Sequence, residues 1–154
     1  MQEVVKTSLG KIYRADKYED ILDHIQFGSD SKMLHYGFPV NLESLKNFYS
    51  NPIIFTDCLV YGYFDKQENL KSFIWFHKGY DPRVNKKLLT EFMWISKNPK
   101  YSIRLLDESL KHISLYYKYD VLVMSRLEQS TKKLDNFYFK KSFLKESVNF
   151  YKLI

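Results

Sequence analysis

The sequence predicts an α/β fold in which helices cover both faces of a mixed β-sheet. Two observations carry this prediction. First, residues 53–97 contain three β-rich runs joined by short turns, the pattern of an antiparallel meander. Second, an amphipathic helix and a short apolar strand follow the third run, which is the order of a strand–helix–strand crossover. No repeat or flexible linker interrupts the chain, so one domain over residues 1–154 is expected.

The N-terminal third is predicted to be helical. Asp16 is a candidate N-cap for a helix through about Gln26, because apolar side chains recur on one face of that stretch. Residues 27–39 are predicted to be a loop. Asn41 is a candidate N-cap for a second helix, which should end before Pro52 because the residue preceding a proline disfavours helical backbone.

The middle of the chain is predicted to be β-structure. The three β-rich runs cover residues 53–65, 70–80 and 86–97. The tetrapeptide KQEN between the first two runs is suited to a hairpin loop, and DPRVN forms a turn before the third.

The last third is predicted to alternate between helix and strand. A helix is expected from about Ser102 to Tyr117, because apolar residues recur there at helical spacing. Residues 119–125 are nearly all apolar, which is typical of a central strand covered on both faces. A helix over residues 130–141 and a strand over residues 144–154 complete the chain. The expected apolar stripe of the first helix is Ile103, Leu106, Leu110, Ile113 and Tyr117.

Charge and cysteine content restrict the partners and the compartment. The formal net charge is +6, which suits an anionic partner such as a nucleotide cofactor or a nucleic acid, and equally a lysine-rich solvated surface. Cys58 is the only cysteine, so an internal disulfide is excluded and a reducing compartment is favoured. The N-terminus lacks the apolar stretch of a signal peptide, and no run is long enough to span a membrane. A cytoplasmic protein without membrane contact is therefore expected.

Residues 88–154 carry three motifs in a recognisable order. LLTEFMWIS is a strand with an internal acidic residue, NPKYSIRLL starts a helix directly after it, and NFYF precedes a last strand that ends in YKLI. Together they resemble the GNAT superfamily of acyl-CoA N-acyltransferases, and in particular the small acetyltransferase-like proteins of bacteriophages. The resemblance implies the GNAT fold, acetyl-CoA as the acetyl donor, a primary amine as the acceptor, and a host-cytoplasm or virion location.

The turn after the predicted strand departs from the family pattern. GNAT proteins usually have an Arg or Gln and two spaced glycines in a longer loop, whereas NPKYSIRLL contains no glycine. Thr131 stands where the family often has an asparagine that contacts the pantetheine arm, and Ser142 replaces a glycine before Phe143. Because glycine lets a backbone come close to a phosphate, a shallower anion site is expected here.

Glu91 is the candidate general base. Strict alternation along the strand would put it on one face with Leu89, Met93 and Ile95. A carboxylate among three large apolar side chains is costly to ionise, so its pKa is expected to rise from the reference value of about 4.3. Such a carboxylate can take a proton from an attacking amine, directly or through a water. The alternative is that Glu91 lies at the sheet rim and pairs with a Lys or Arg.

Tyr138 is the candidate general acid. It matches the family tyrosine that protonates the departing CoA thiolate, and proton transfer from a phenol (pKa about 10) to a thiolate (about 8.5) is nearly balanced. The chain has 13 tyrosines, and simple packing is the alternative for one within NFYF.

The turn between strand and helix is the candidate donor site. The amides of Tyr101 to Arg104 open the helix, and Lys97 and Lys100 add positive charge nearby, an arrangement that attracts phosphate. The alternative is that Ser102 merely caps the helix. In the family, the fourth and fifth strands splay apart and strand amides hold the pantetheine arm and the thioester carbonyl. The donor-binding candidates implied in this way are Trp94, Ile95, Ser96, Lys97, Tyr101, Ser102, Ile103, Arg104 and Thr131.

The other candidate residues favour no further chemistry. The four histidines show no metal-ligand spacing, so no metal is expected, and Cys58 has no partner nearby in the sequence. His77 is expected on the surface unless neighbouring β runs pair in a register that brings it to Glu91. Three lysine pairs could contact the 3′-phosphate of CoA or a nucleic-acid backbone, or could simply be solvated. These pairs are Lys86-Lys87, Lys132-Lys133 and Lys140-Lys141.

Three functions are therefore open. The first is an N-acetyltransferase with Glu91 as base and Tyr138 as acid, whose acceptor, a small molecule or a protein, sits between the N-terminal helices and the sheet. The second is a catalytically inactive protein on the same fold, acting in a homo-oligomer or in a phage or host protein complex. The third is a basic nucleic-acid-binding protein, although the sequence has no RRM, KH, helix-turn-helix or zinc-finger pattern.

Overall fold

The computed structural model describes residues 1–30, 34–35, 38–124, 136 and 140–141. The chain divides into two compact units, Met1–Met124 and Ser125–Ile154, and each is described by itself. The helix expected over residues 130–141 and the strand expected over 144–154 fall almost entirely outside the described residues. The expectation of a single domain stays a prediction.

A six-stranded mixed sheet forms the centre of the first unit, in the spatial order β1-β2-β5-β6-β7-β8. Every neighbouring pair is antiparallel except β7 and β8, which run parallel. The strands β5, β6 and β7 form the predicted meander, and β7, the following helix and β8 form the predicted crossover. The strands are β1 (Gln2–Thr7), β2 (Gly10–Arg14), β5 (Cys58–Asp65), β6 (Leu70–Asp81), β7 (Lys86–Ser96) and β8 (Val121–Val123).

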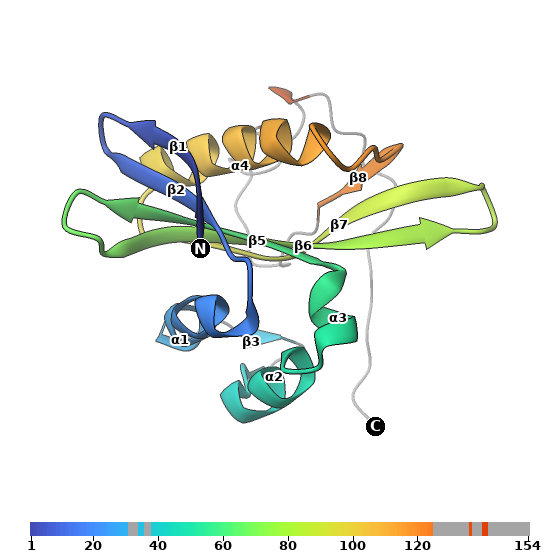
Figure 1. Cartoon of the computed structure of the whole chain (residues 1–154), viewed down its shortest axis with the longest axis horizontal. Coiled ribbons are helices and arrows are strands. Elements are labelled where there is room, and N and C mark those ends of the chain that lie inside the picture. The colour runs from blue at the N-terminus through green and yellow to red at the C-terminus, as the bar shows by residue number, and fades with distance from the viewer. Residues whose placement is uncertain (31–33, 36–37, 125–135, 137–139, 142–154) are drawn as a thin grey trace. The chain divides into compact units, whose positions relative to one another are not determined.

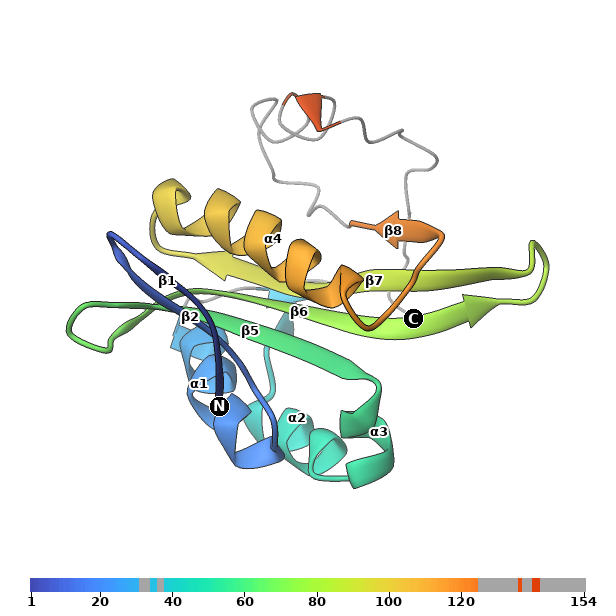
Figure 2. The ribbon, with the colours of Figure 1, turned by 45° about the horizontal axis from the view of Figure 1, so that its top comes forward.

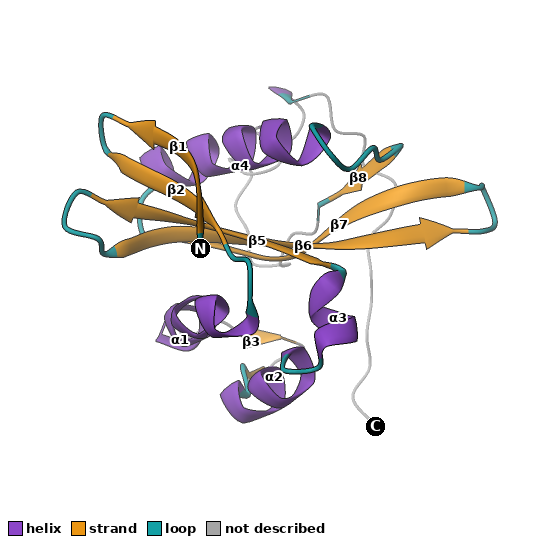
Figure 3. Cartoon of the chain, viewed as in Figure 1, coloured by secondary structure: helices purple, strands orange, loops and turns teal. Residues whose placement is uncertain are grey.

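Helices cover both faces of this sheet, which confirms the predicted α/β class (Figures 1 and 3). One face is covered by α4 (Pro99–Ser114), which lies along the strands in both ribbon views (Figure 2). The opposite face is covered by the N-terminal helices and short elements between them. These are the 3-10 helix η1 (Tyr18–Ile21), α1 (Leu22–Asp30), β3 (Leu34–His35), β4 (Phe38–Pro39), α2 (Leu42–Tyr49) and α3 (Pro52–Thr56).

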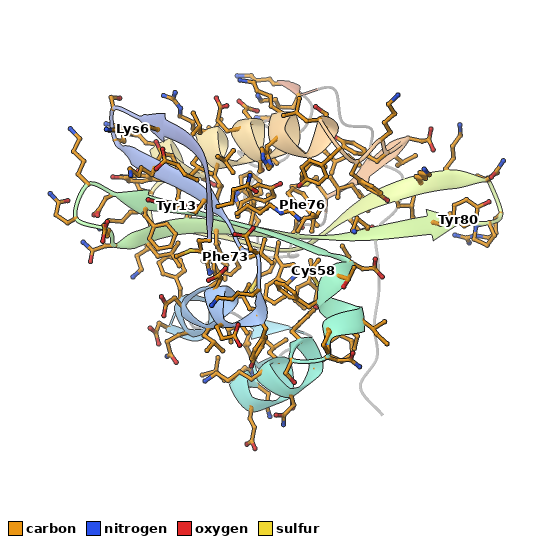
Figure 4. All side chains as sticks on the ribbon, viewed as in Figure 1. Lys6, Tyr13, Cys58, Phe73, Phe76 and Tyr80 are labelled. Atoms are coloured by element: carbon orange, nitrogen blue, oxygen red, sulfur yellow. The ribbon has the colours of Figure 1, made fainter. Side chains whose placement is uncertain are left out.

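Both faces of the sheet are packed with large apolar side chains. Alternation along β6 sends Phe76 toward α4 and Phe73 toward α1, as Figure 4 shows. Leu105, Leu106 and Ile113 of α4 are buried against the first of these faces. The core on the second face contains Ala15, Ile21, Ile25, Phe27, Tyr49, Cys58, Val60, Phe73, Trp75 and Met93.

The prediction of helix throughout the N-terminal third was wrong for residues 2–14, which form the β1–β2 hairpin. The turn depends on Gly10, whose φ of +149° is a conformation that L side chains rarely adopt. A Cβ at this position would lie 2.0 Å from the carbonyl oxygen of Phe64 in β5. The hairpin therefore joins the sheet at a point where only a bare backbone fits.

The predicted helix boundaries were partly correct. Asn41 caps α2 as expected, because its Oδ1 accepts from the amide of Ser44 at 2.9 Å. The first helix differs, since Lys17 is its N-cap and the carboxylate of Asp20, not Asp16, accepts from the amides of residues 16 and 17. It also continues to Asp30, into the stretch predicted as loop.

The first β-rich run was predicted too long. Residues 52–56 form α3 instead of strand, because Asn51 caps them and Pro52 stands at the start of the helix, where its missing amide hydrogen costs nothing. The strand β5 begins only at Cys58. Figure 4 shows Cys58 at the point where α3 passes into β5.

The last described elements also differ from expectation. Helix α4 begins at Pro99 instead of Ser102, and Ile103 is 42% exposed, so it does not belong to the buried stripe. Strand β8 is the last strand of the sheet within the described residues, and Val121 and Val123 are 41% and 40% exposed. The exposure of the two valines contradicts the expected cover on both faces, whereas the expected central position stays a prediction because residues 144–154 lie outside the described part.

We predict that His24 makes the fold sensitive to acid. The side chain is 1% exposed, and burial lowers its pKa to about 4, against the opposing attraction of Asp20 and Asp23. Below pH 6.5 the His24 imidazole becomes protonated in the unfolded chain, whereas in the folded protein it stays neutral until about pH 4. The free energy of unfolding is therefore highest above pH 6.5 and falls by up to about 3 kcal/mol toward pH 4. Urea unfolding across this range should show a flatter profile for His24→Leu, and parallel profiles would contradict the prediction.

We predict that Gly62→Ala destabilises the fold by about 1–3 kcal/mol. The added Cβ would lie 2.5 Å from Nε2 of His24 and 2.8 Å from a ring carbon of Phe64. Gly79→Ala is the matched control in the next strand, because its nearest contact would be an ordinary 3.8 Å from Cβ of Leu88. Thermal unfolding of both variants checks this, and equal melting temperatures would refute it.

Candidate functional site

Strand β7 extends past the end of β8 in the described residues. Its last pair with β8 is Thr90 with Val123, whereas its pairing with β6 continues as far as Ser96 opposite Ser72. Among the described residues, the segment 91–96 therefore pairs with β6 on one side and has no described strand partner on the other. The expected parting of the two strands stays a prediction, because the chain after Met124 lies outside the described residues.

A β-bulge at the start of this segment decides which way its side chains point. Glu91 pairs with Phe76 and Met93 pairs with Trp75, so Phe92 is an extra residue on β7. Glu91 consequently shares the α4 face with Phe76, while Met93 and Phe92 pack into the core under α1 to α3. The expectation from strict alternation, which put Glu91 and Met93 on one face, was wrong because the bulge reverses the alternation.

Glu91 is 8% exposed, so it lies inside the fold and not at an exposed rim of the sheet. Its carboxylate is one of the few buried charged or polar groups among the described residues. Burial of a carboxylate is costly unless it is paired or takes up a proton. The role of Glu91 as a proton acceptor therefore stays a prediction.

The turn from β7 to α4 consists of two residues, Lys97 and Asn98, and Asn98 is the N-cap. Oδ1 of Asn98 accepts from the amide of Lys100 at 2.9 Å. Its carbonyl oxygen accepts from the amides of Tyr101 and Ser102 at 3.1 and 3.3 Å. The alternative that Ser102 caps the helix was wrong.

The backbone donors at the start of α4 are therefore engaged within the turn itself. Pro99 has no amide hydrogen, the next three amides bond to Asn98, and the amide of Lys97 donates to the carbonyl of Lys71 on β6 at 3.1 Å. Expecting the amides of Tyr101 and Ser102 to face a phosphate was wrong for the described state. An anion at this end of the helix would therefore be bound mainly by the charged side chains of Lys97, Lys100 and Arg104.

A hollow of about 560 Å³ lies beside this turn. Three lysines and one carboxylate line it, so its charge is positive. Lys71 Nζ lies 3.0 Å from the Asp65 carboxylate, whose pKa is lowered to about 2, chiefly by the amide hydrogen bond from Asn69. Lys97 Nζ lies 4.5 Å from the ring centre of Phe27. The lining residues are Ser8, Leu9, Asp65, Lys66, Gln67, Lys71, Lys97, Asn98 and Tyr101.

A second group of polar side chains lies on the other face of the sheet, under α2 and α3. Tyr49 Oη and His77 Nε2 are 2.8 Å apart, and His77 Nδ1 is 4.0 Å from the sulfur of Cys58. Burial lowers the pKa of His77 and raises those of Tyr49 and Cys58, the last to about 11. This is a neutral hydrogen-bonded cluster.

Sequence reasoning missed this cluster, and the expectation of an exposed His77 was wrong because the residue is half-buried. His77 pairs with Thr90 and Phe76 pairs with Glu91, so His77 and Glu91 occupy opposite faces. A signal was available: counting outward from the KQEN loop pairs position 58 with position 77 across the first hairpin, as the structure does.

The donor-binding candidates fall into three places. Trp94, Ile95 and Ser96 end β7, and Lys97 is in the turn. The ring of Tyr101 packs edge-on against Tyr63 at 4.9 Å, which fixes it at the start of the helix. The remaining described candidates, Ser102, Ile103 and Arg104, form the first turns of α4, whereas Thr131 and Tyr138 lie outside the described residues.

The described residues contain no candidate metal site and no candidate membrane-spanning helix. No three His, Cys, Asp or Glu side chains in the described part come together in a way that could hold a metal ion. Every helix among these residues is too short or too polar to cross a membrane.

Comparison with known proteins gives a likeness in structure. No protein-family model and no curated protein matches the sequence. A solved structure of a probable acetyltransferase superposes with a TM-score of 0.68 at 15% identity, covering 93% of this chain and 96% of that one. An aminoglycoside acetyltransferase from an uncultured soil metagenomic sample gives 0.66 at 14% identity, with 94% and 95% covered.

A third solved structure, the ribosomal-protein-alanine N-acetyltransferase from Brucella melitensis biovar Abortus 2308, gives a TM-score of 0.64 at 9% identity, with 93% and 99% covered. At these identities the likeness concerns the fold. Together with the mixed sheet and the strand–helix–strand crossover, it shows that this chain has the fold of the GNAT superfamily of acetyltransferases.

Proposed function

We propose that this protein is an N-acetyltransferase that moves the acetyl group of acetyl-CoA to a primary amine by direct attack. The observation that carries the proposal is the likeness of the fold to solved acetyltransferases, with Glu91 buried on β7 shortly before this strand leads into α4. In a protein with the GNAT fold, the acyl donor lies beside this strand.

The donor would lie along Trp94, Ile95 and Ser96, with its phosphates near the start of α4. Because the amides of this helix end are engaged, the phosphates would be held mainly by ionic hydrogen bonds from Lys97, Lys100 and Arg104. Thr131 is retained as a candidate contact to the pantetheine arm. Because flexible side chains lose conformational entropy when they bind, we expect a lower affinity for acetyl-CoA than a site of fixed backbone amides would give.

The chemistry would need one group that accepts a proton and one that donates one. The neutral amine attacks the thioester carbon, so a C–N bond forms and the C–S bond breaks. Glu91 takes a proton from the attacking nitrogen, and Tyr138 gives a proton to the departing thiolate and regains one from solvent. The buried position of Glu91 on the α4 face, on the strand that leads into this helix, supports its part.

The acceptor is proposed to be a primary amine on a small molecule or on a protein. The similar solved structures include an aminoglycoside acetyltransferase and a ribosomal-protein-alanine N-acetyltransferase, which shows that the fold accommodates both kinds of acceptor. The acceptor would approach from the side of α1 to α3, where the Tyr49–His77 pair lies.

We predict that the purified protein binds acetyl-CoA and that Lys97→Gln and Arg104→Gln each weaken binding by about tenfold, the value of one ionic hydrogen bond. Calorimetry at low salt measures this. Lys111→Gln is the matched control, because it removes a lysine of the same helix that already pairs with Glu108. A wild-type protein that binds no acetyl-CoA at millimolar concentration would remove the transferase proposal and leave the non-catalytic scaffold.

We predict that Glu91→Gln lowers kcat by about 10²–10⁴-fold without weakening acetyl-CoA binding. The amide keeps the size of the side chain and removes its negative charge and its basicity. Release of the CoA thiol in the presence of an amine acceptor measures turnover, and Glu108→Gln on α4, which removes the partner of Lys111, serves as the control. Undiminished turnover in Glu91→Gln would exclude this residue as the base.

A further inference from the structure

The hollow beside the start of α4 is enclosed by three turns that meet at one end of the sheet. Ser8 and Leu9 come from the β1–β2 turn, residues 65–67 from the β5–β6 turn, and Asn98 from the turn between β7 and α4. Figure 1 shows these turns together at the end of the sheet where α4 begins. The volume of about 560 Å³ is within the range of small-molecule sites.

Two of these turns are fixed by contacts within the fold. The β1–β2 turn lies against β5, because Gly10 approaches the carbonyl of Phe64 so closely that no Cβ fits between them. In the β5–β6 turn, Oδ1 of Asp65 accepts from the amides of Gln67 and Asn69, each at 2.9 Å. A site with walls that are already ordered loses little conformational entropy when a ligand binds.

The charge of the hollow favours an anion. Three lysines and one carboxylate line it, which leaves two positive charges in excess. The carboxylate, Asp65, is already compensated by its amide hydrogen bonds and by Nζ of Lys71 at 3.0 Å. Lys66 and Lys97 form no ion pair within the described part of the chain. A phosphate group in the hollow would therefore meet ammonium groups that other carboxylates do not occupy.

The hollow also has an apolar part. Leu9 is 37% exposed at the tip of the β1–β2 turn. The ring of Tyr101 is held in place by its edge-on contact with Tyr63. A ligand that combines an aromatic ring with a phosphate group can use both the apolar and the charged lining, whereas a bare inorganic anion can use only the charge.

The proposed acetyl donor has such a part directly beside its diphosphate. In acetyl-CoA the diphosphate is bonded to a ribose that carries both an adenine and a 3′-phosphate. Lys97, one of the side chains proposed to hold the donor phosphates, also lines the hollow. A donor with its diphosphate at Lys97 therefore has its ribose at the edge of the hollow.

We propose that this hollow binds the 3′-phosphoadenosine part of acetyl-CoA. Lys66 and Lys71 hold the 3′-phosphate, and the adenine ring lies against Leu9 and Tyr101. The Lys71 ammonium has three N–H donors, so it can serve Asp65 and a phosphate together. This inference deepens the proposed function and rests on it. It makes the β5–β6 turn the part of the protein that distinguishes CoA from thioesters without a 3′-phosphate.

The test is calorimetry at low salt with CoA and with 3′-dephospho-CoA. The wild-type protein should bind CoA about tenfold more tightly, the value of one ionic hydrogen bond. The double variant Lys66→Gln, Lys71→Gln should bind both ligands equally, through a loss of affinity for CoA alone. Lys6→Gln is the matched control, because Lys6 lies at the same end of the sheet (Figure 4) but does not line the hollow. It should keep the tenfold preference.

Equal wild-type affinities for the two ligands would overturn the inference, and so would a double variant that binds both more weakly by the same factor. A wild-type protein that binds neither ligand overturns the proposed function and this inference together. Binding of both ligands without preference overturns this inference alone and leaves the proposed function standing.

A second measurement uses the wild-type protein only, so it does not depend on how a variant folds. Adenosine 3′,5′-bisphosphate should shift the amide NMR signals of residues 8–9 and 65–67, and 5′-AMP should shift them less. Unchanged signals at these residues would overturn the inference. Binding of the bisphosphate by a protein that does not bind CoA would assign the hollow to another nucleotide and would also overturn it.

Discussion

Strand β7 carries one residue more than β6 beside Trp75 and Phe76, and this bulge reverses the side from which every later side chain of the strand emerges. Before it, Glu91 points to the α4 face; after it, Met93 belongs to the core under the N-terminal helices. The bulge also comes directly after the last described pair of β7 with β8. Glu91 and the Tyr49–His77 pair lie on opposite faces of the sheet because Glu91 pairs with Phe76 and His77 is the next residue of β6.

The parts of the fold that could be predicted from sequence were those with a strong period. The meander was predictable because β-branched and aromatic residues are concentrated in three runs, and the crossover because an amphipathic helix separates two apolar strands. The hairpin at residues 2–14 was missed because its pattern is short and depends on one glycine whose constraint comes from Phe64, far away in the chain. Local sequence does not contain such a constraint.

The candidate site could be predicted in part. The turn near residue 97 and the acidic residue six positions before it were recognisable from their order, because a strand, a turn and a helix follow each other without interruption. The face of Glu91 was not, because a bulge is a property of two strands and appears only when β6 and β7 are paired. The Tyr49–His77 contact joins α2 to β6, and no single stretch of sequence indicates it. Asn98 as the cap was obscured by Ser102, which is an equally good capping residue.

The N-cap of α4 has a consequence for any ligand that approaches this helix. Asn98 accepts three backbone hydrogen bonds, one through its side chain and two through its carbonyl, and the Ser96 hydroxyl also donates to that carbonyl at 2.8 Å. The residue thereby acts as a tethered stand-in for an oxyanion. A free anion that binds the amide of Lys100 must first displace the Asn98 carboxamide. Its net gain in binding free energy is therefore only the difference between the two hydrogen bonds, and the helix end binds anions less well than one with free amides.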